Sequence, residues 1–120
     1  MGQAVVEAAL VLPILLLFLL GTIDLGRAFT VYVSVANAAR EGARHCALHP
    51  GDTTGTQLRM AGELGSLVLA DTASATCPTV PSGAPVTVRL AATFQPITPL
   101  ISSLTGGPVR IEAPATMVVW

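Results

Sequence analysis

Residues 2–21, GQAVVEAALVLPILLLFLLG, decide the fold, because they form an apolar segment long enough to cross a membrane. With its flanking residues the apolar run reaches about 20 positions, which matches a hydrocarbon core of roughly 30 Å. Pro13 lies inside the run and predicts a kink or one loosened helical turn. One carboxylate, Glu7, stands near the start, although acids in membrane helices are costly and usually paired. The segment predicts a transmembrane helix over residues 3–24 that carries an unexplained acid.

Two other interpretations of this segment stay open. A secretory signal peptide has a similar apolar core, but its basic start and its A-x-A cleavage site are not evident around residues 2–21. Glu7 can also lie at the level of the lipid headgroups, where a carboxylate costs little. The first arginine, Arg27, lies about 30 Å further along a helix, so it is no partner for Glu7.

Composition indicates a chain that is largely hidden from water. Its 120 residues suffice for one small domain beside the apolar segment. Hydrophobic residues make up 52%, charged residues 11%, and the mean hydropathy is +0.69, whereas about a quarter of residues are charged in ordinary soluble domains. The net charge is −1 and the arginines are scattered, so no basic patch for nucleic acid is present. Lipid, other subunits or both are expected to cover much of the surface.

The helical pattern continues past the membrane segment. Apolar and small residues recur at spacings of three and four: Leu25, Phe29, Tyr32, Ala36, Ala39, Ala43 and Cys46. One continuous helix of about 45 residues, roughly 65 to 70 Å long, is the simplest prediction. Asp24 and Arg27 mark the membrane exit. The alanines and Gly42 of the outer half allow another helix or a sheet to approach closely.

A second, shorter helix is predicted over residues 57–71, after the turn-rich HPGDTTGT at residues 49–56. Thr54 or Thr56 is its expected N-cap. Its expected packing face comprises Leu58, Ala61, Leu64 or Gly65, and Val68. A short strand around Cys77 is expected to follow.

The C-terminal third predicts two strands. In residues 86–94 the inward residues are Val86, Val88, Leu90, Ala92 and Phe94, and in residues 109–120 they are Val109, Ile111, Ala113, Ala115, Met117 and Val119. Pro114 indicates an edge strand or a bulge. PLISSL, residues 99–104, is expected to form one helical turn. The predicted fold class is α+β, with a long N-terminal helix whose outer half packs on a small antiparallel sheet.

Cys46 and Cys77 are the candidates for a disulfide, which fits an oxidising compartment. Two unpaired buried thiols are the alternative. His45, Cys46 and His49, with Cys77 as a fourth ligand, have a spacing that also suits zinc, although exposed polar residues beside a disulfide explain the histidines as well. No serine lies in a Gly-x-Ser-x-Gly setting and no carboxylate pair suits acid–base catalysis. We therefore predict no metal, no cofactor and no enzymatic activity.

The segment GQAVVEAALVLPILLLFLLGTIDLGR, with ANAAREGAR at residues 36–44, resembles the start of TadE-like proteins, pilin-related components of the tight-adherence (Tad) branch of type IV pilus systems. The resemblance continues more loosely to the C-terminal ATMVVW. It implies a pilin-like fold, an inner-membrane helix and an extracytoplasmic domain over residues 25–120. It also implies other pilin-like subunits and a prepilin peptidase as partners.

The resemblance offers an explanation for the acid. In type IV prepilins a membrane-embedded aspartic peptidase cuts after a glycine, and a glutamate is the fifth residue of the mature chain. Carried over, cleavage falls between Gly2 and Gln3, residues 1–2 form a leader, and Glu7 is the fifth mature residue. The new amine on Gln3 is cationic at neutral pH, so it can pair with Glu7 of its own or a neighbouring subunit.

The expected function is that of a minor pilin or pseudopilin. A major filament-forming pilin is the first alternative, since residues 72–120 contain only Arg89, Arg110 and Glu112 as charged residues. A single-span membrane-anchored binding module that never polymerises is the alternative from another class. The arginines after the span favour a cytoplasmic domain by the positive-inside rule, whereas the resemblance places that domain outside the cytoplasm, or outside the cell within a pilus.

Overall fold

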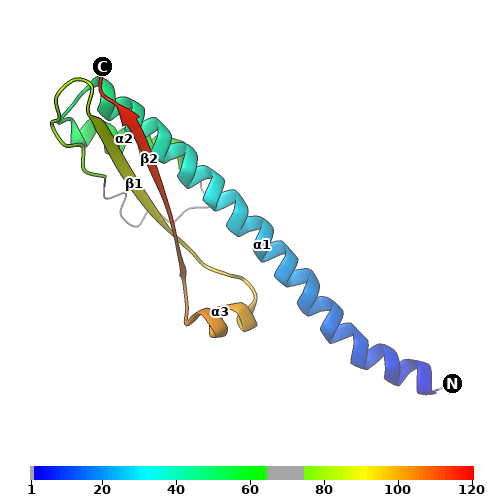
Figure 1. Ribbon diagram of the computed structural model, residues 1–120. Helices are drawn as coiled ribbons and strands as arrows, with labels where there is room; N and C mark the ends of the chain where they lie inside the picture. Colours follow the sequence, from blue (N-terminus) through cyan, green and yellow to red (C-terminus); the bar gives the residue numbers. More distant parts are fainter. Residues whose placement is uncertain (1, 65–74) are drawn as a thin grey trace.

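A computed structural model describes residues 2–64 and 75–120. The molecule measures 77 × 21 × 20 Å, and one long helix runs along its whole length with a folded domain against the outer half (Figure 1). The elements are α1 (Gly2–Leu48), α2 (Thr53–Glu63), β1 (Pro85–Phe94), α3 (Pro99–Thr105) and β2 (Val109–Val118). The predicted α+β arrangement, a long apolar helix on a small antiparallel sheet, is confirmed.

Helix α1 has 47 residues and continues through Pro13 without a break in helical assignment. It ends at Leu48 because His49 precedes Pro50, and a residue before proline disfavours the α conformation. Gly51 then turns the chain with a φ of 90°, a value that side-chain-bearing residues rarely adopt. The predicted kink at Pro13 stays a prediction.

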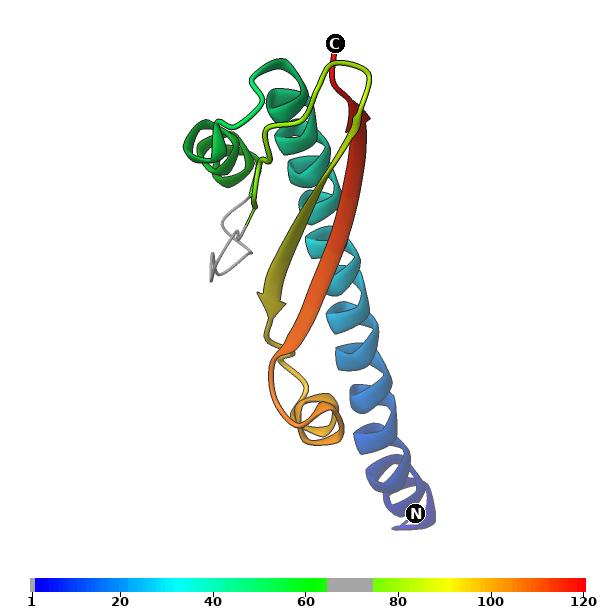
Figure 2. The ribbon, with the colours of Figure 1, turned by 60° about the vertical axis from the view of Figure 1, so that its left-hand side comes forward.

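Strands β1 and β2 form a two-stranded antiparallel sheet along the outer half of α1 (Figure 2). Their pairing is continuous from Pro85 opposite Val118 to Phe94 opposite Val109. The predicted inward face of β1 is buried at every position, in the pattern expected of alternation. Pro114 lies opposite Arg89 with no bulge. Since both strands of a two-stranded sheet have a free edge, the edge-strand interpretation of Pro114 is correct.

The core lies between the sheet and one face of α1. That face is built from small and β-branched residues: Val31, Val35, Ala38, Ala39, Gly42, Ala43 and Cys46. Three residues predicted on the same face are instead exposed, Leu25 by 73%, Phe29 by 67% and Tyr32 by 50%. The narrow sheet covers only one side of the helix, and it packs where short side chains permit close approach. The larger apolar residues are left on an uncovered side.

Helix α2 differs from its prediction in position and orientation. Asp52, rather than Thr54 or Thr56, is the N-cap, and its carboxylate accepts a 2.9 Å hydrogen bond from the Gly55 amide. The helix ends at Glu63. Thr56 and Met60 are its buried residues, whereas the predicted Leu58 is 69% exposed. Ala61 is exposed as well. Gly65 and Val68 lie outside the described residues.

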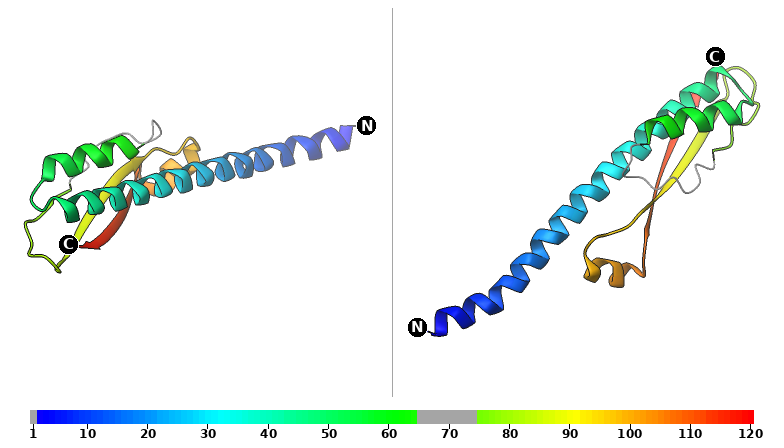
Figure 3. Two further views of the ribbon diagram at one scale, coloured as in Figure 1. Left: turned by 90° about the horizontal axis from the view of Figure 1, so that it is seen from above. Right: turned by 180° about the vertical axis from the view of Figure 1, so that it is seen from behind.

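The orientation of α2 follows from its contact with α1, beside which it lies (Figure 3). Gly42 of α1 faces Met60, and a Cβ placed at Gly42 would collide with the Met60 sulfur. The missing side chain thus creates the space that Met60 fills. The predicted strand around Cys77 is not formed within residues 75–80. The Cys77 amide instead donates to the Thr53 hydroxyl at 3.3 Å, and Gln57 donates to the Ala75 carbonyl at 3.2 Å.

We expect Gly42→Leu to destabilise the domain, because a branched side chain would displace the fully buried Met60. Overpacking of this kind costs about 1 to 3 kcal/mol, which lowers the melting temperature of a domain of this size by roughly 5 to 20 °C. Thermal unfolding of the detergent-solubilised chain measures it. Gly26→Leu is the control, since a Cβ at Gly26 meets nothing within 4 Å. Equal melting temperatures for the two variants would contradict the proposed packing.

Candidate assembly surface

The N-terminal part of α1 presents only exposed residues. Residues 2–20 are all exposed in the isolated chain. An 18-residue window of this helix has a mean hydropathy of 2.6 and no buried residue, and in the described part of the chain it is the one helix with the length and composition to cross a membrane. Exposing so large an apolar surface to water is unfavourable. Lipid or other subunits must therefore cover it.

The apolar surface does not end where the span ends. Leu25, Phe29 and Tyr32, which we call the outer stripe, lie on one face of α1 at spacings of four and three. Their exposed fractions are 73%, 67% and 50%. Half-buried Ala36 continues this face, and Arg40 is the next residue along it. The outer stripe thus extends the apolar surface of the span about two turns into the folded domain.

Asp24 holds the far end of the sheet against α1. It is 2% exposed, and its two carboxylate oxygens accept hydrogen bonds from the amides of Ile97 at 2.9 Å and Thr98 at 2.7 Å. Arg27 lies 3.3 Å from the same carboxylate. The Arg27 guanidinium also lies over the Phe94 ring, 5.2 Å from its centroid. These contacts fix the loop before α3 beside the predicted membrane exit.

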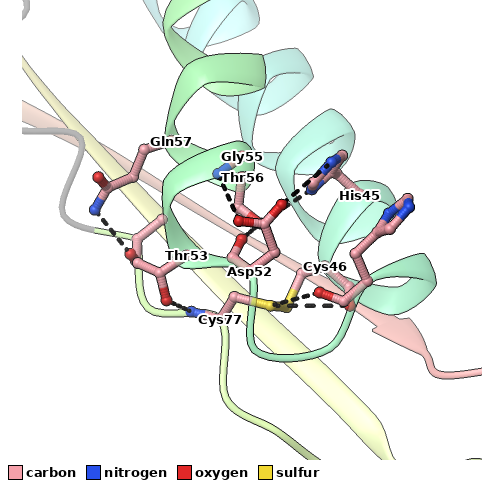
Figure 4. The surroundings of a disulfide bond; sticks show 10 residues. His45, Cys46, Asp52, Thr53, Gly55, Thr56, Gln57 and Cys77 are labelled. Carbon is pink, nitrogen blue, oxygen red and sulfur yellow. Dashed lines mark hydrogen bonds and ion pairs between the residues drawn. A yellow bond between two sulfur atoms is a disulfide. The ribbon is translucent and has the colours of Figure 1, made fainter.

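The opposite end of the domain is closed by a disulfide between Cys46 of α1 and Cys77 (Figure 4). Both residues are buried, with exposed fractions of 0% and 5%. The bridge encloses α2, which is also joined to the segment around Cys77 through Thr53 and Gln57. The disulfide therefore connects the end of α1 to the segment that leads into the sheet.

The nearby histidines contact one another and α2. The His45 and His49 rings stack with centroids 4.7 Å apart. His45 Nδ1 lies 3.4 Å from the Thr56 hydroxyl, and His45 Nε2 lies 3.9 Å from an Asp52 oxygen. The zinc alternative needed Cys46 and Cys77 as ligands, and both sulfur atoms are already in the disulfide. Within residues 2–64 and 75–120 no cluster of three metal-binding side chains is found.

Comparison with known proteins identifies the first part of the chain. The family model of TadE-like proteins matches residues 2–44. This segment is TadE-like. The match confirms the resemblance inferred from the same residues. No curated protein and no solved structure matches the chain.

The TadE-like segment contains nearly all of α1, including the membrane-length run, the outer stripe, Asp24 and the glycine that receives Met60. It stops before Cys46. Helix α2, the sheet and α3 lie beyond it. The match therefore bears on the helix, and the rest of the domain is interpreted from its own contacts.

Gly2, Gln3 and Glu7 lie in the first two turns of the TadE-like helix, and all three are exposed. Gln3 and Glu7 are four residues apart, so they lie on the same face. A Cβ at Gly2 would meet nothing within 4 Å, so packing within the chain does not require a glycine there. None of the ion pairs formed by the described residues involves Glu7. Cleavage after Gly2 and pairing of Glu7 stay predictions.

Asp24 is the residue whose role the sequence did not reveal. It was predicted only to mark the membrane exit, yet its partners are amides 73 and 74 positions further along the chain. A carboxylate at the end of a long charge-free run is the available signal. The sequence does not indicate which backbone donors it meets.

Proposed function

We propose that this chain is a pilin-like subunit of a Tad-type pilus system, in the role of a minor pilin or pseudopilin. The observation that carries the proposal is the exposed apolar surface of α1, which continues beyond the span into the outer stripe. A membrane anchor alone needs only the span. The TadE-like match over residues 2–44 supports the same assignment.

During assembly α1 leaves the lipid and packs against the corresponding helices of other subunits. Within the membrane the span is already in an apolar environment, so the transfer itself gains little from the hydrophobic effect. The outer stripe projects beyond the span into water, so burying it on assembly gains more free energy from the hydrophobic effect. Fully burying a leucine or phenylalanine side chain contributes about 1.5 to 3 kcal/mol. The outer stripe therefore favours the assembled state over the free subunit.

Pairing of Glu7 sets the register between the helices in this assembly. After cleavage by a prepilin peptidase, the Gln3 amine and the Glu7 carboxylate lie one turn apart on α1. In a packed array of helices the Glu7 of one subunit pairs with the Gln3 amine of another. A buried charge without a partner is strongly unfavourable, so only the register that forms the pair is stable.

The disulfide supports an extracytoplasmic domain. Disulfides persist in oxidising compartments and are rare in the cytosol. The arginines that follow the span, beginning with Arg27, argue for the opposite orientation. Two of them are neutralised locally: Arg27 pairs with Asp24, and Arg44 makes two hydrogen bonds to Glu41 at 2.8 and 2.9 Å. We therefore give the disulfide more weight in assigning the orientation.

A major filament subunit is the second candidate, favoured by the low charge of the domain. Between residues 75 and 120 only Arg89, Arg110 and Glu112 are charged. Such a surface tolerates lateral contacts with many neighbours. The ratio of this chain to other pilins in sheared surface fractions distinguishes the roles, since a major subunit dominates and a minor one is a small fraction.

Phe29→Glu tests the proposed function. Phe29 is 67% exposed in the isolated chain, so we expect normal folding and membrane insertion. In an assembly the introduced carboxylate would be buried without a partner, and we expect incorporation into sheared filaments to fall about tenfold or more. Immunoblotting of sheared and membrane fractions measures it.

The matched control is Thr30→Glu. Thr30 is also exposed and lies one residue further along α1, about 100° around the helix from the outer stripe. We expect it to assemble far better than Phe29→Glu. Unchanged incorporation of Phe29→Glu would favour the simple membrane-anchored binding module, because such a protein needs no contact at the outer stripe.

A further inference from the structure

The connection between β1 and β2 lies beside the membrane-length part of α1 (Figure 2). We call residues 97–105, which include α3, the foot. A groove of about 310 Å³ separates the foot from α1, lined by Leu17, Phe18 and Gly21 on one side and by Leu100 and Ile101 on the other. Asp24 binds the Ile97 and Thr98 amides and so keeps the foot at this height.

The span fixes the depth of the foot. Residues 8–23 are free of charge and extend about 24 Å along a helix, already less than the roughly 30 Å core of a bilayer. The part of the run that faces the foot, residues 17–23, therefore cannot be left outside the lipid. A segment packed beside it must share its depth, at the outer boundary of the hydrocarbon.

The side chains of the foot suit that position. Ile97, Leu100 and Leu104 are exposed by 60%, 47% and 78%, and none of residues 95–108 is charged. The first charged residue after the foot is Arg110, and Arg27 lies one turn beyond the span on α1. An apolar tip followed by arginines matches the order of acyl chains and phosphates at a bilayer surface.

Three of the four side-chain hydroxyls of the foot are paired within the chain, whereas the buried Thr98 hydroxyl has no hydrogen-bond partner among the described residues. The hydroxyls of Ser102, Ser103 and Thr105 donate to the carbonyls of Pro99, Leu100 and Ile101, each at 2.9 Å. The Gly107 amide donates to the Ser102 carbonyl, also at 2.9 Å. Groups already paired within the chain lose little on leaving water, which is the requirement for backbone that enters lipid.

We propose that the foot rests in the leaflet of a phospholipid bilayer that faces the folded domain, with Ile97, Leu100 and Leu104 among the acyl chains and an acyl chain filling the groove against α1. The domain then has two attachments to the membrane, the span and the foot. This contact goes beyond the proposed function, because it concerns the free subunit and requires no filament. It rests only on insertion of α1.

Fluorescence quenching by brominated lipid tests the proposal. The chain has one tryptophan, Trp120, at the opposite end of the domain from the foot (Figure 1). Full-length protein is reconstituted at high lipid excess into phosphatidylcholine vesicles, with or without bromine on the upper part of the acyl chains. Leu104→Trp, in a Trp120→Phe background, reports the foot. Leu16→Trp in the same background reports the span.

We expect the tryptophan introduced by Leu104→Trp to emit at shorter wavelength than Trp120 and to be quenched about twofold or more, since interfacial segments lie roughly 5 to 10 Å into the boundary region. Trp120 should be unaffected. Ile97→Trp, at another exposed position, provides a second probe of the foot.

Two results would overturn the proposal. If Leu16→Trp is quenched while Leu104→Trp and Ile97→Trp behave like Trp120, the foot lies in water although α1 is inserted. If Leu16→Trp is not quenched, α1 is not in the bilayer and the depth argument fails with it. The first result would contradict the membrane contact of the foot and leave the proposed function intact, whereas the second would also contradict the membrane insertion of α1 that the proposed function requires.

Discussion

Glu7→Ala is expected to abolish incorporation of this chain into filaments while leaving it in the membrane. Removing Glu7 would leave the other charge of the proposed pair uncompensated in the assembly, and we expect incorporation to fall about a hundredfold or more. Insertion should be retained or improved, because the substitution removes the acid near the start of the apolar run. The measurement is the amount of variant in sheared surface fractions relative to the amount in membranes.

Two further variants separate charge from shape. Glu7→Gln keeps the size of the side chain but not the charge, and we expect it to fail like Glu7→Ala. Val6→Ala, at the neighbouring exposed position, removes apolar volume and should assemble nearly normally. N-terminal sequencing of each variant checks whether the chain begins at Gln3, as the proposed processing after Gly2 requires. Normal assembly of both Glu7 variants would show that Glu7 only occupies the headgroup level.

The double substitution Cys46→Ala with Cys77→Ala is expected to be the most destabilising change in the domain. The bridge joins residues 31 positions apart, and closing a loop of that length contributes about 3 to 4 kcal/mol in the chain-entropy model. That is a large part of the stability of a small domain. We expect the melting temperature of the solubilised chain to fall by roughly 15 to 25 °C.

Reduction of the unmodified chain should reproduce this loss, and it also tests orientation. In the native membrane neither cysteine should react with a thiol reagent until a reductant is added, as expected in an oxidising compartment. Thiols that react at once would place the domain in the cytosol. A melting temperature that is nearly unchanged in the double variant would mean that packing alone holds Cys46 and the segment around Cys77 together.

The long elements could be predicted because their patterns are local. Helix α1 follows from an apolar run continued at helical spacing, and β1 from strict alternation between Val86 and Phe94. The end of α1 follows from Pro50 and Gly51. These features depend on neighbours within a few positions, so the sequence carries them directly.

What could not be predicted depends on other elements. Periodicity places Leu25, Phe29 and Tyr32 on one face, but it does not say that the sheet is too narrow to cover them. The predicted packing face of α2 was wrong at Leu58 and Ala61, although Leu64 does pack against the core. The buried face is decided by Gly42 on another helix. The contact of Asp24 with Ile97 and Thr98 spans more than 70 positions. None of these follows from local spacing.

The central claim is that the chain is processed and assembled as a pilin, and the N-terminus of the native protein tests it most directly. Intact mass and N-terminal sequencing should be carried out on protein from native membranes and from sheared surface fractions. A mature chain that begins at Gln3 is the predicted result, since it creates the amine that Glu7 requires. A chain that still begins at Met1 in the sheared fraction would contradict processing after Gly2 and favour an ordinary membrane anchor.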